Sequence, residues 1–158
     1  MKIRLPEHIL KHYKHIIRVY AAFVMLSIIM VNPVNAQQEV YLIAAKGSGI
    51  EAISNRDIRR IFLGLKSVDS ERVNKPVINL SDRKVYEDFL KNVLHMTDGA
   101  YKRKIVKRIF RNGAEEIEEL DMLEELNRHL LSNVGDISFA DHDTVQKMHD
   151  IEVVKVLW

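Results

Sequence analysis

Cysteine is absent from this 158-residue chain, which excludes disulfide bonds and any chemistry that needs a thiol. The sequence also lacks a Gly-x-Ser-x-Gly nucleophile elbow and a phosphate-binding P-loop. No internal repeat or low-complexity linker divides it. After residue 36, no apolar run approaches the roughly 20 residues that span a bilayer. These absences predict a single domain that is not an enzyme and holds no cofactor.

The first 36 residues have the pattern of a secretory signal peptide. Five basic residues and one acidic residue accompany an apolar run from Val19 to Val31, and short residues lead up to Ala36. A basic start, a short apolar middle and a small residue at the cut are the three parts of such a signal. We expect cleavage after Ala36 and a periplasmic mature chain of residues 37–158. The alternative is an uncleaved segment that stays as a membrane anchor.

The mature part of the chain carries a small acidic excess. The first 36 residues hold five of the 24 basic and one of the 22 acidic residues, which leaves 19 basic and 21 acidic residues. This balance argues against a nucleic acid partner. An exported chain without cysteine also fits the bacterial envelope better than an animal secretion.

Apolar periodicity predicts four strands and four helices in the mature chain. Short apolar runs typical of strands occupy residues 40–45, 76–80, 137–140 and 151–158. Helical stripes begin after the caps Ser54, Ser81 or Asp82, and Thr97, and a fourth helix is expected over residues 114–132. Strands that alternate with helices indicate an α/β domain with a mixed, largely parallel sheet.

Two turns at predicted strand ends are candidates for binding a small anion. Ser48 and Gly49 follow the first strand, and Ser81 and Arg83 lie at the start of the second helix. Backbone N–H groups at a helix N-terminus attract anions, and arginine adds a charged fork. In an open α/β sheet both turns would lie at the carboxyl ends of strands, where ligands bind. The alternative is structural: the glycines form a turn, Ser81 or Asp82 caps the helix, and the Asp82 carboxylate repels an anion.

Three segments carry a family resemblance. They are Ile53–Gly64, which ends in Ile-Phe-Leu-Gly, then Pro76–Ser81 leading to Phe89, and Asn133–Phe139. In order and spacing they resemble short exported relatives of the phosphate-binding proteins of ABC transporters. The resemblance implies a type II periplasmic-binding-protein fold, as a single small domain or a reduced two-lobe form. It also implies binding of phosphate or another small anion for transport or sensing.

The same comparison of residues leaves a second function open. The turn from Asn79 to Arg83 lacks the glycines of phosphate receptors, and the chain is much shorter than a two-lobed receptor. These departures favour an accessory protein that keeps the lobe fold without its ligand. Such a protein would contact an envelope or inner-membrane protein of a transport or signalling system.

Charged residues form two blocks of opposite sign. Residues 102–111 include six basic side chains, and residues 115–125 include seven acidic ones. The two blocks either pair with each other or form a docking surface for a protein or for anionic lipid head groups.

The histidines of the C-terminal half do not have the compact spacing of a metal site. His142 and His149, each followed by an aspartate, are seven residues apart, so we expect no bound metal. His129 is expected on the surface of the fourth helix.

Overall fold

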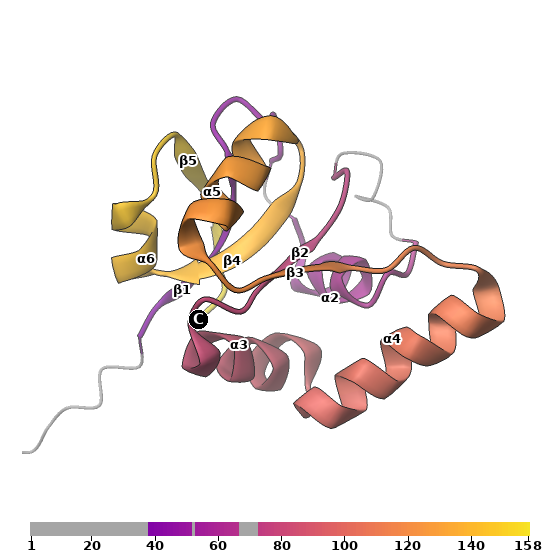
Figure 1. The fold of residues 1–158 in the computed structure, drawn as a ribbon. Helices are drawn as coiled ribbons and strands as arrows, with labels where there is room; N and C mark the ends of the chain where they lie inside the picture. Colours follow the sequence, from indigo (N-terminus) through magenta and orange to yellow (C-terminus); the bar gives the residue numbers. More distant parts are fainter. Residues whose placement is uncertain (1–37, 52, 67–72) are drawn as a thin grey trace, which may run out of the picture. The chain divides into compact units, whose positions relative to one another are not determined.

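A computed structural model describes residues 38–51, 53–66 and 73–158, so the expected signal or anchor segment lies outside the described residues. Figure 1 shows the order of the elements. The strands are β1 (Val40–Ala45), β2 (Val77–Asn79), β3 (Glu118–Leu120), β4 (Ile137–Asp141) and β5 (Ile151–Val156). The helices are α2 (Asn55–Phe62), α3 (Arg83–Phe89), the π-helical η2 (Leu90–Leu94), α4 (Asp98–Asn112), α5 (Leu123–Ser132) and α6 (His142–Lys147). No helix within these ranges is both long enough and apolar enough to cross a membrane.

The three-stranded sheet has the order β4-β1-β5, and both of its pairings are antiparallel. The predicted α/β class is confirmed, but the expectation of a largely parallel sheet is wrong. β4 and β5 do run in the same direction and are joined by α6, as in a parallel crossover. β1 lies between them and runs the opposite way. Alternation of strands and helices predicts such a crossover, but it does not reveal that the first strand is inserted between the last two.

The second sheet is a parallel pair of β2 and β3. The chain crosses between them through α3, η2 and α4, the long connection that parallel strands need. Here the predicted helix over residues 114–132 is wrong in its first half, because Glu118–Leu120 forms β3 and only Leu123–Ser132 is helical. The glutamates favour a helix locally. Pairing with β2 prevails because Ile117 is buried in the core and the Leu80 N–H donates to the last carbonyl of β3 at 2.7 Å.

Side-chain caps fix where the helices begin, largely as the sequence predicts. Ser54 accepts a hydrogen bond from the first turn of α2 at 3.1 Å, and Thr97 accepts one from the first turn of α4 at 3.4 Å. Of the two candidates for α3, Asp82 and not Ser81 is the cap. After α2, Gly64 adopts a φ of 63°, the left-handed conformation that terminates helices.

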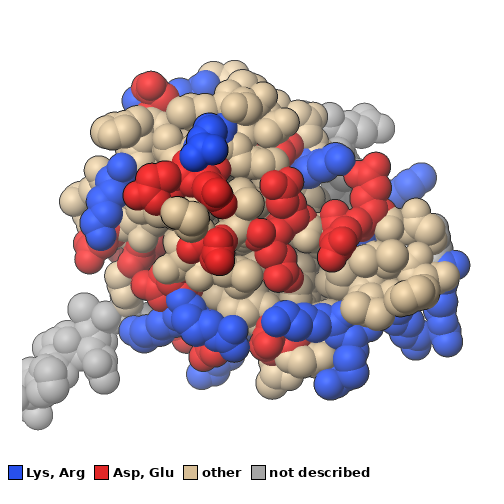
Figure 2. Space-filling view, viewed as in Figure 1, with Lys and Arg blue, Asp and Glu red and all other residues tan. Residues whose placement is uncertain are grey.

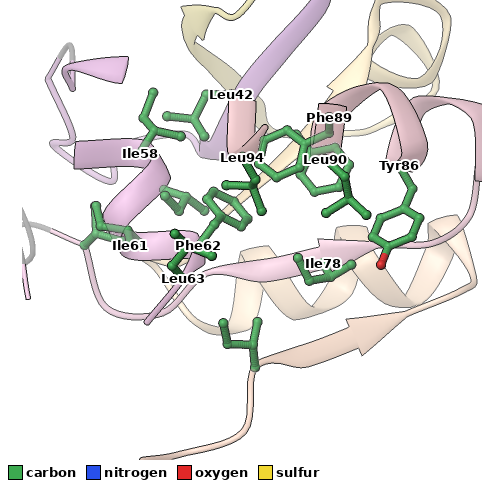
Figure 3. Packing of buried hydrophobic residues seen from close by; sticks show 14 of the residues in the cluster. Leu42, Ile58, Ile61, Phe62, Leu63, Ile78, Tyr86, Phe89, Leu90 and Leu94 are labelled. Atoms are coloured by element: carbon green, nitrogen blue, oxygen red, sulfur yellow. The ribbon is translucent and has the colours of Figure 1, made fainter. Parts of the chain in front are cut away.

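Helices cover both faces of β1. On one face Leu42 packs with α2 and α3 around a cluster of buried residues (Figure 3). At its centre, ring centroids are 4.8 Å apart for Phe62 and Phe89, 5.9 Å for Phe62 and Phe139, and 3.8 Å for Phe89 and Phe139. On the other face Ile43 packs against buried leucines of α5. Successive strand residues point to opposite faces, so this confirms that the apolar run of β1 is a strand buried on both sides.

Candidate functional site

The turn after β1 is held by a carboxylate and not arranged around an open anion site. The Ser48 hydroxyl donates to Glu152 Oε1 at 2.8 Å, and the N–H of Ile50 donates weakly to the Ser48 oxygen at 3.3 Å. Gly49 supplies a φ of 68° to the turn. A negative charge within hydrogen-bond distance of Ser48 opposes the approach of an anion.

The start of α3 has its hydrogen-bonding groups already occupied. The Asp82 carboxylate accepts from the N–H groups of Lys84 and Val85 at 2.8 and 3.0 Å. These are the donors that an anion at a helix N-terminus would need. The Ser81 hydroxyl and N–H both donate to the side-chain oxygen of Asn79, at 2.6 and 2.9 Å. The chain's own carboxylate therefore takes the place of an external anion.

Arg83 is also engaged within the protein. Its guanidinium lies 2.7 Å from Glu87 and 3.8 Å from Asp98, and 5.6 Å from the centre of the Tyr86 ring. The hydrogen bond to Glu87 raises the pKa of Arg83. Two carboxylates already share this cation, and they link α3 to the first turn of α4.

The structure does not bring the two predicted halves of the anion site together. β4 is antiparallel to β1 and, through the bridge between Pro76 and Ile137, parallel to β2. β1 and β2 therefore run in opposite directions. In Figure 1 the turn after β1, which holds Ser48, lies at the top, and the start of α3, after Ser81, lies near the bottom. About one strand length separates them, roughly 20 Å for six residues. The expectation of a shared pocket is wrong because it assumed parallel strands.

A histidine sits between two carboxylates where α5, β3 and the turn before β4 meet. His129 Nε2 lies 2.8 Å from Asp136 Oδ2, and His129 Nδ1 lies 3.3 Å from Glu118 Oε1. Asp136 is buried and also accepts from the N–H of Lys75 at 3.1 Å. These residues line a cavity of about 290 Å³. His129 was expected on a helix surface. Its pairing with Asp136 could have been suspected from the sequence, because the predicted turn after α5 brings the chain back towards that helix.

The described residues contain no group of three or more potential ligands that could hold a metal ion. His142 instead lies 3.4 Å from the Tyr41 hydroxyl and 2.7 Å from the Gln146 amide. The His129 side chain brings two carboxylates to one imidazole, and its contacts join α5, β3 and the turn before β4. We therefore read it as a structural contact between α5, β3 and the turn.

The basic block lies on the exposed side of α4. We use the term α4 surface for Arg103, Lys104, Val106, Lys107, Phe110 and Arg111. In the described part of the chain, none of its four cations has a carboxylate partner. Figure 2 shows basic side chains along the lower region of the molecule and acidic ones gathered over β3 and α5. Mutual pairing of the two blocks therefore does not account for these cations.

A groove of about 580 Å³ runs along the α4 surface. Leu63 and Leu65, at the end of α2, contribute its apolar lining, and arginines and lysines of α4 contribute the rest. The neighbouring Arg108 turns inward and donates to the backbone carbonyls of Gly64 and Glu115. It thereby ties α4 to the end of α2 and to the segment before β3.

No protein-family model matches the chain, and no curated protein matches it.

Proposed function

We propose that the mature chain is an exported, non-catalytic accessory protein of the bacterial envelope that acts by docking and not by capturing a small anion. The observation that carries this proposal is the Asp82 cap. Its carboxylate occupies the N–H groups of α3 that a phosphate receptor would offer to its ligand. Separation of Ser48 from Ser81 supports the same conclusion, because the remaining groups do not converge.

We also propose that the fold is a reduced relative of the phosphate-binding proteins. Support comes from the segment Ile53–Gly64, which forms a capped helix with a left-handed glycine after it, and from the strand-to-helix turn at Asn79–Arg83. In this view the chain keeps the turn of a receptor lobe, and an aspartate takes over the position of the ligand. The partner would be a membrane component of a transport or signalling system.

Titration calorimetry of the exported protein with phosphate and with sulfate tests the proposal. We expect no heat of binding at millimolar anion and no rise in the melting temperature, since a ligand that binds the folded state must stabilise it. Asp82→Asn is the matched variant, because asparagine also caps helices but carries no charge. We expect Asp82→Asn to show no heat of anion binding and no rise in melting temperature either.

Saturable heat in the parent protein, together with a higher melting temperature, would contradict the accessory role and favour a solute receptor. Loss of that heat on Ser81→Ala or Arg83→Gln would then place the anion at α3, whereas loss on Ser48→Ala would place it after β1.

A further inference from the structure

We propose that the α4 surface docks on a membrane that contains anionic phospholipids, with Phe110 entering the interface and the neighbouring cations contacting lipid phosphates. This rests on the docking role proposed above and adds a lipid surface beside the membrane component named there. Two apolar side chains are exposed on this surface, neighbouring cations have no carboxylate partner among the described residues, and charge is unevenly distributed over the domain.

The apolar part of the surface is Phe110 and Val106. The Phe110 side chain is 86% exposed and Val106 is 50% exposed. They are four residues apart, so they are neighbours on one helical face. Interfacial helices place such residues at the boundary of head groups and acyl chains. Phe110 is thus almost fully exposed on a helix that buries Tyr101 and Ile105 on its other side, so its ring is free to insert into an apolar layer.

The cations flank this apolar pair. At 100° per residue, Arg103, Lys107 and Arg111 lie on one side of Phe110, and Lys102 lies on the other side of Val106. Lys102 is paired with Asp98 at 3.4 Å. The other three are exposed, with no carboxylate partner in the described part of the chain. Long basic side chains can keep their charges at the phosphates while their stems lie along apolar material.

The groove beside α4 matches the chemistry of a lipid head group. Leu63 and Leu65 form an apolar wall, and the opposite wall carries arginine and lysine side chains. A phosphate with an attached acyl chain presents the complementary combination of negative charge and apolar material. An acidic protein would supply the negative charge, but it would also need an apolar pocket that fits the protruding Phe110 side chain. A fluid lipid layer needs no preformed pocket.

The charge distribution would orient the domain on such a surface. The α4 sequence holds six basic residues, and residues 115–125 hold seven acidic ones. Figure 2 shows acidic side chains gathered over β3 and α5. With the acidic region facing away from the membrane, a chain with a slight overall acidic excess still has a favourable contact through α4.

Vesicle co-sedimentation of the exported protein tests the proposal. We expect binding to vesicles that contain phosphatidylglycerol and none to phosphatidylcholine alone. Phe110→Ala should weaken binding roughly tenfold, from the loss of one inserted aromatic side chain. Reversal of Arg103, Lys107 and Arg111 to glutamate should weaken it on the order of a hundredfold or more, since each lost cation contributes about fivefold.

The matched control reverses three exposed cations elsewhere, Arg56, Arg128 and Lys147, to glutamate. It has the same net charge as the α4 triple variant and should retain binding. Phe110→Ala cannot fail for lack of folding, because the side chain packs against little of the protein. Equal loss of binding in both triple variants would mean that net charge alone acts, and would overturn the assignment to α4.

Two further arms separate the lipid surface from other anions. Inorganic phosphate at matched ionic strength should not displace the protein from vesicles; displacement would make free phosphate the ligand and overturn membrane docking. Binding to polyglutamate but not to vesicles, abolished by the α4 triple variant, would replace the lipid surface by an acidic protein. Either result would contradict membrane docking and leave the calorimetric test of anion binding unchanged. The two proposals can therefore be rejected independently.

Discussion

At the scale of single residues, Tyr86 links two helices through a charge. Its hydroxyl donates to Asp98 Oδ1 at 2.6 Å, joining α3 to the first turn of α4. This hydrogen bond is the main reason that the pKa of Asp98 lies below its usual value of 3.8, and Lys102 and Arg83 lower it further. Burial is the main cause of the raised pKa of Tyr86. The carboxylate form is therefore the one that the folded state favours.

Tyr86→Phe should destabilise the protein by about 1.5–3 kcal/mol at neutral pH, the range for a hydrogen bond to a charged group. A carboxyl whose pKa is lowered by folding stabilises the folded state above its unfolded pKa, and this contribution is lost as pH falls through the folded pKa. The stability difference between parent and variant should therefore shrink below about pH 4. Denaturant unfolding at a series of pH values measures it.

Tyr101→Phe is the control. Its hydroxyl donates to the neutral carbonyl of Phe62 at 3.2 Å, so the loss of stability should not depend on acid pH. If the Tyr86 and Tyr101 variants show the same pH dependence, the charge on Asp98 is not what Tyr86 stabilises.

At the scale of elements, the junction of α2 and α4 depends on one glycine. Gly64 has a φ of 63°, and a Cβ atom there would fall on the guanidinium of Arg108. The absence of a side chain lets Arg108 reach the Gly64 carbonyl and close the end of α2. The Phe-Leu-Gly sequence thus has a packing reason as well as a conformational one.

Gly64→Ala should cost about 2–3 kcal/mol, from the left-handed backbone and from displacement of Arg108. Gly113 is the matched control: its φ is 59°, but nothing lies within 4 Å of a Cβ built there. Gly113→Ala should therefore cost only the conformational part, about 1 kcal/mol. Thermal or denaturant unfolding of both variants measures the difference; equal losses would remove any special role for Arg108.

The local elements were predictable where the signal is local. Neighbouring residues alone predict the caps at Ser54 and Thr97 and the strand β1. The structure confirms all three. β3 was not predictable in this way, because Glu118 and Glu119 favour a helix and only the distant β2 makes them a strand. In the candidate site, the sequence left Ser81 and Asp82 as possible caps of α3. Hydrogen bonds from the N–H groups of Lys84 and Val85 to Asp82 show that Asp82 is the cap.

At the scale of the whole molecule, strand direction was the part that the sequence did not contain. The neighbours of β1 come from the end of the chain, and no local pattern records that both are antiparallel to it. The predicted convergence of the two turns is wrong for the same reason, since they meet only in a parallel sheet. The basic block on α4 was visible in the sequence, but only the structure shows that Arg103, Lys107 and Arg111 have no carboxylate partner among the described residues.

For the whole molecule, we predict export with cleavage of the first 36 residues. Exported protein should begin at Gln37, because Ala36 offers the small residue that cleavage requires. N-terminal sequencing and intact mass of the periplasmic fraction measure it. Ala36→Leu should block cleavage and accumulate a precursor, while the conservative Ala36→Ser should not. A mature mass that still includes Met1 would indicate the retained anchor instead.

The position of β1 has a consequence for the order in which the chain folds. Val40 exchanges backbone hydrogen bonds with Leu157 and Trp158, and its partner in β4 is Asp141. A strand whose neighbours follow roughly a hundred residues later pairs late in folding, because contacts so distant in sequence are slow to form. If the chain is exported as predicted, β1 would complete its pairing only after β5 has emerged.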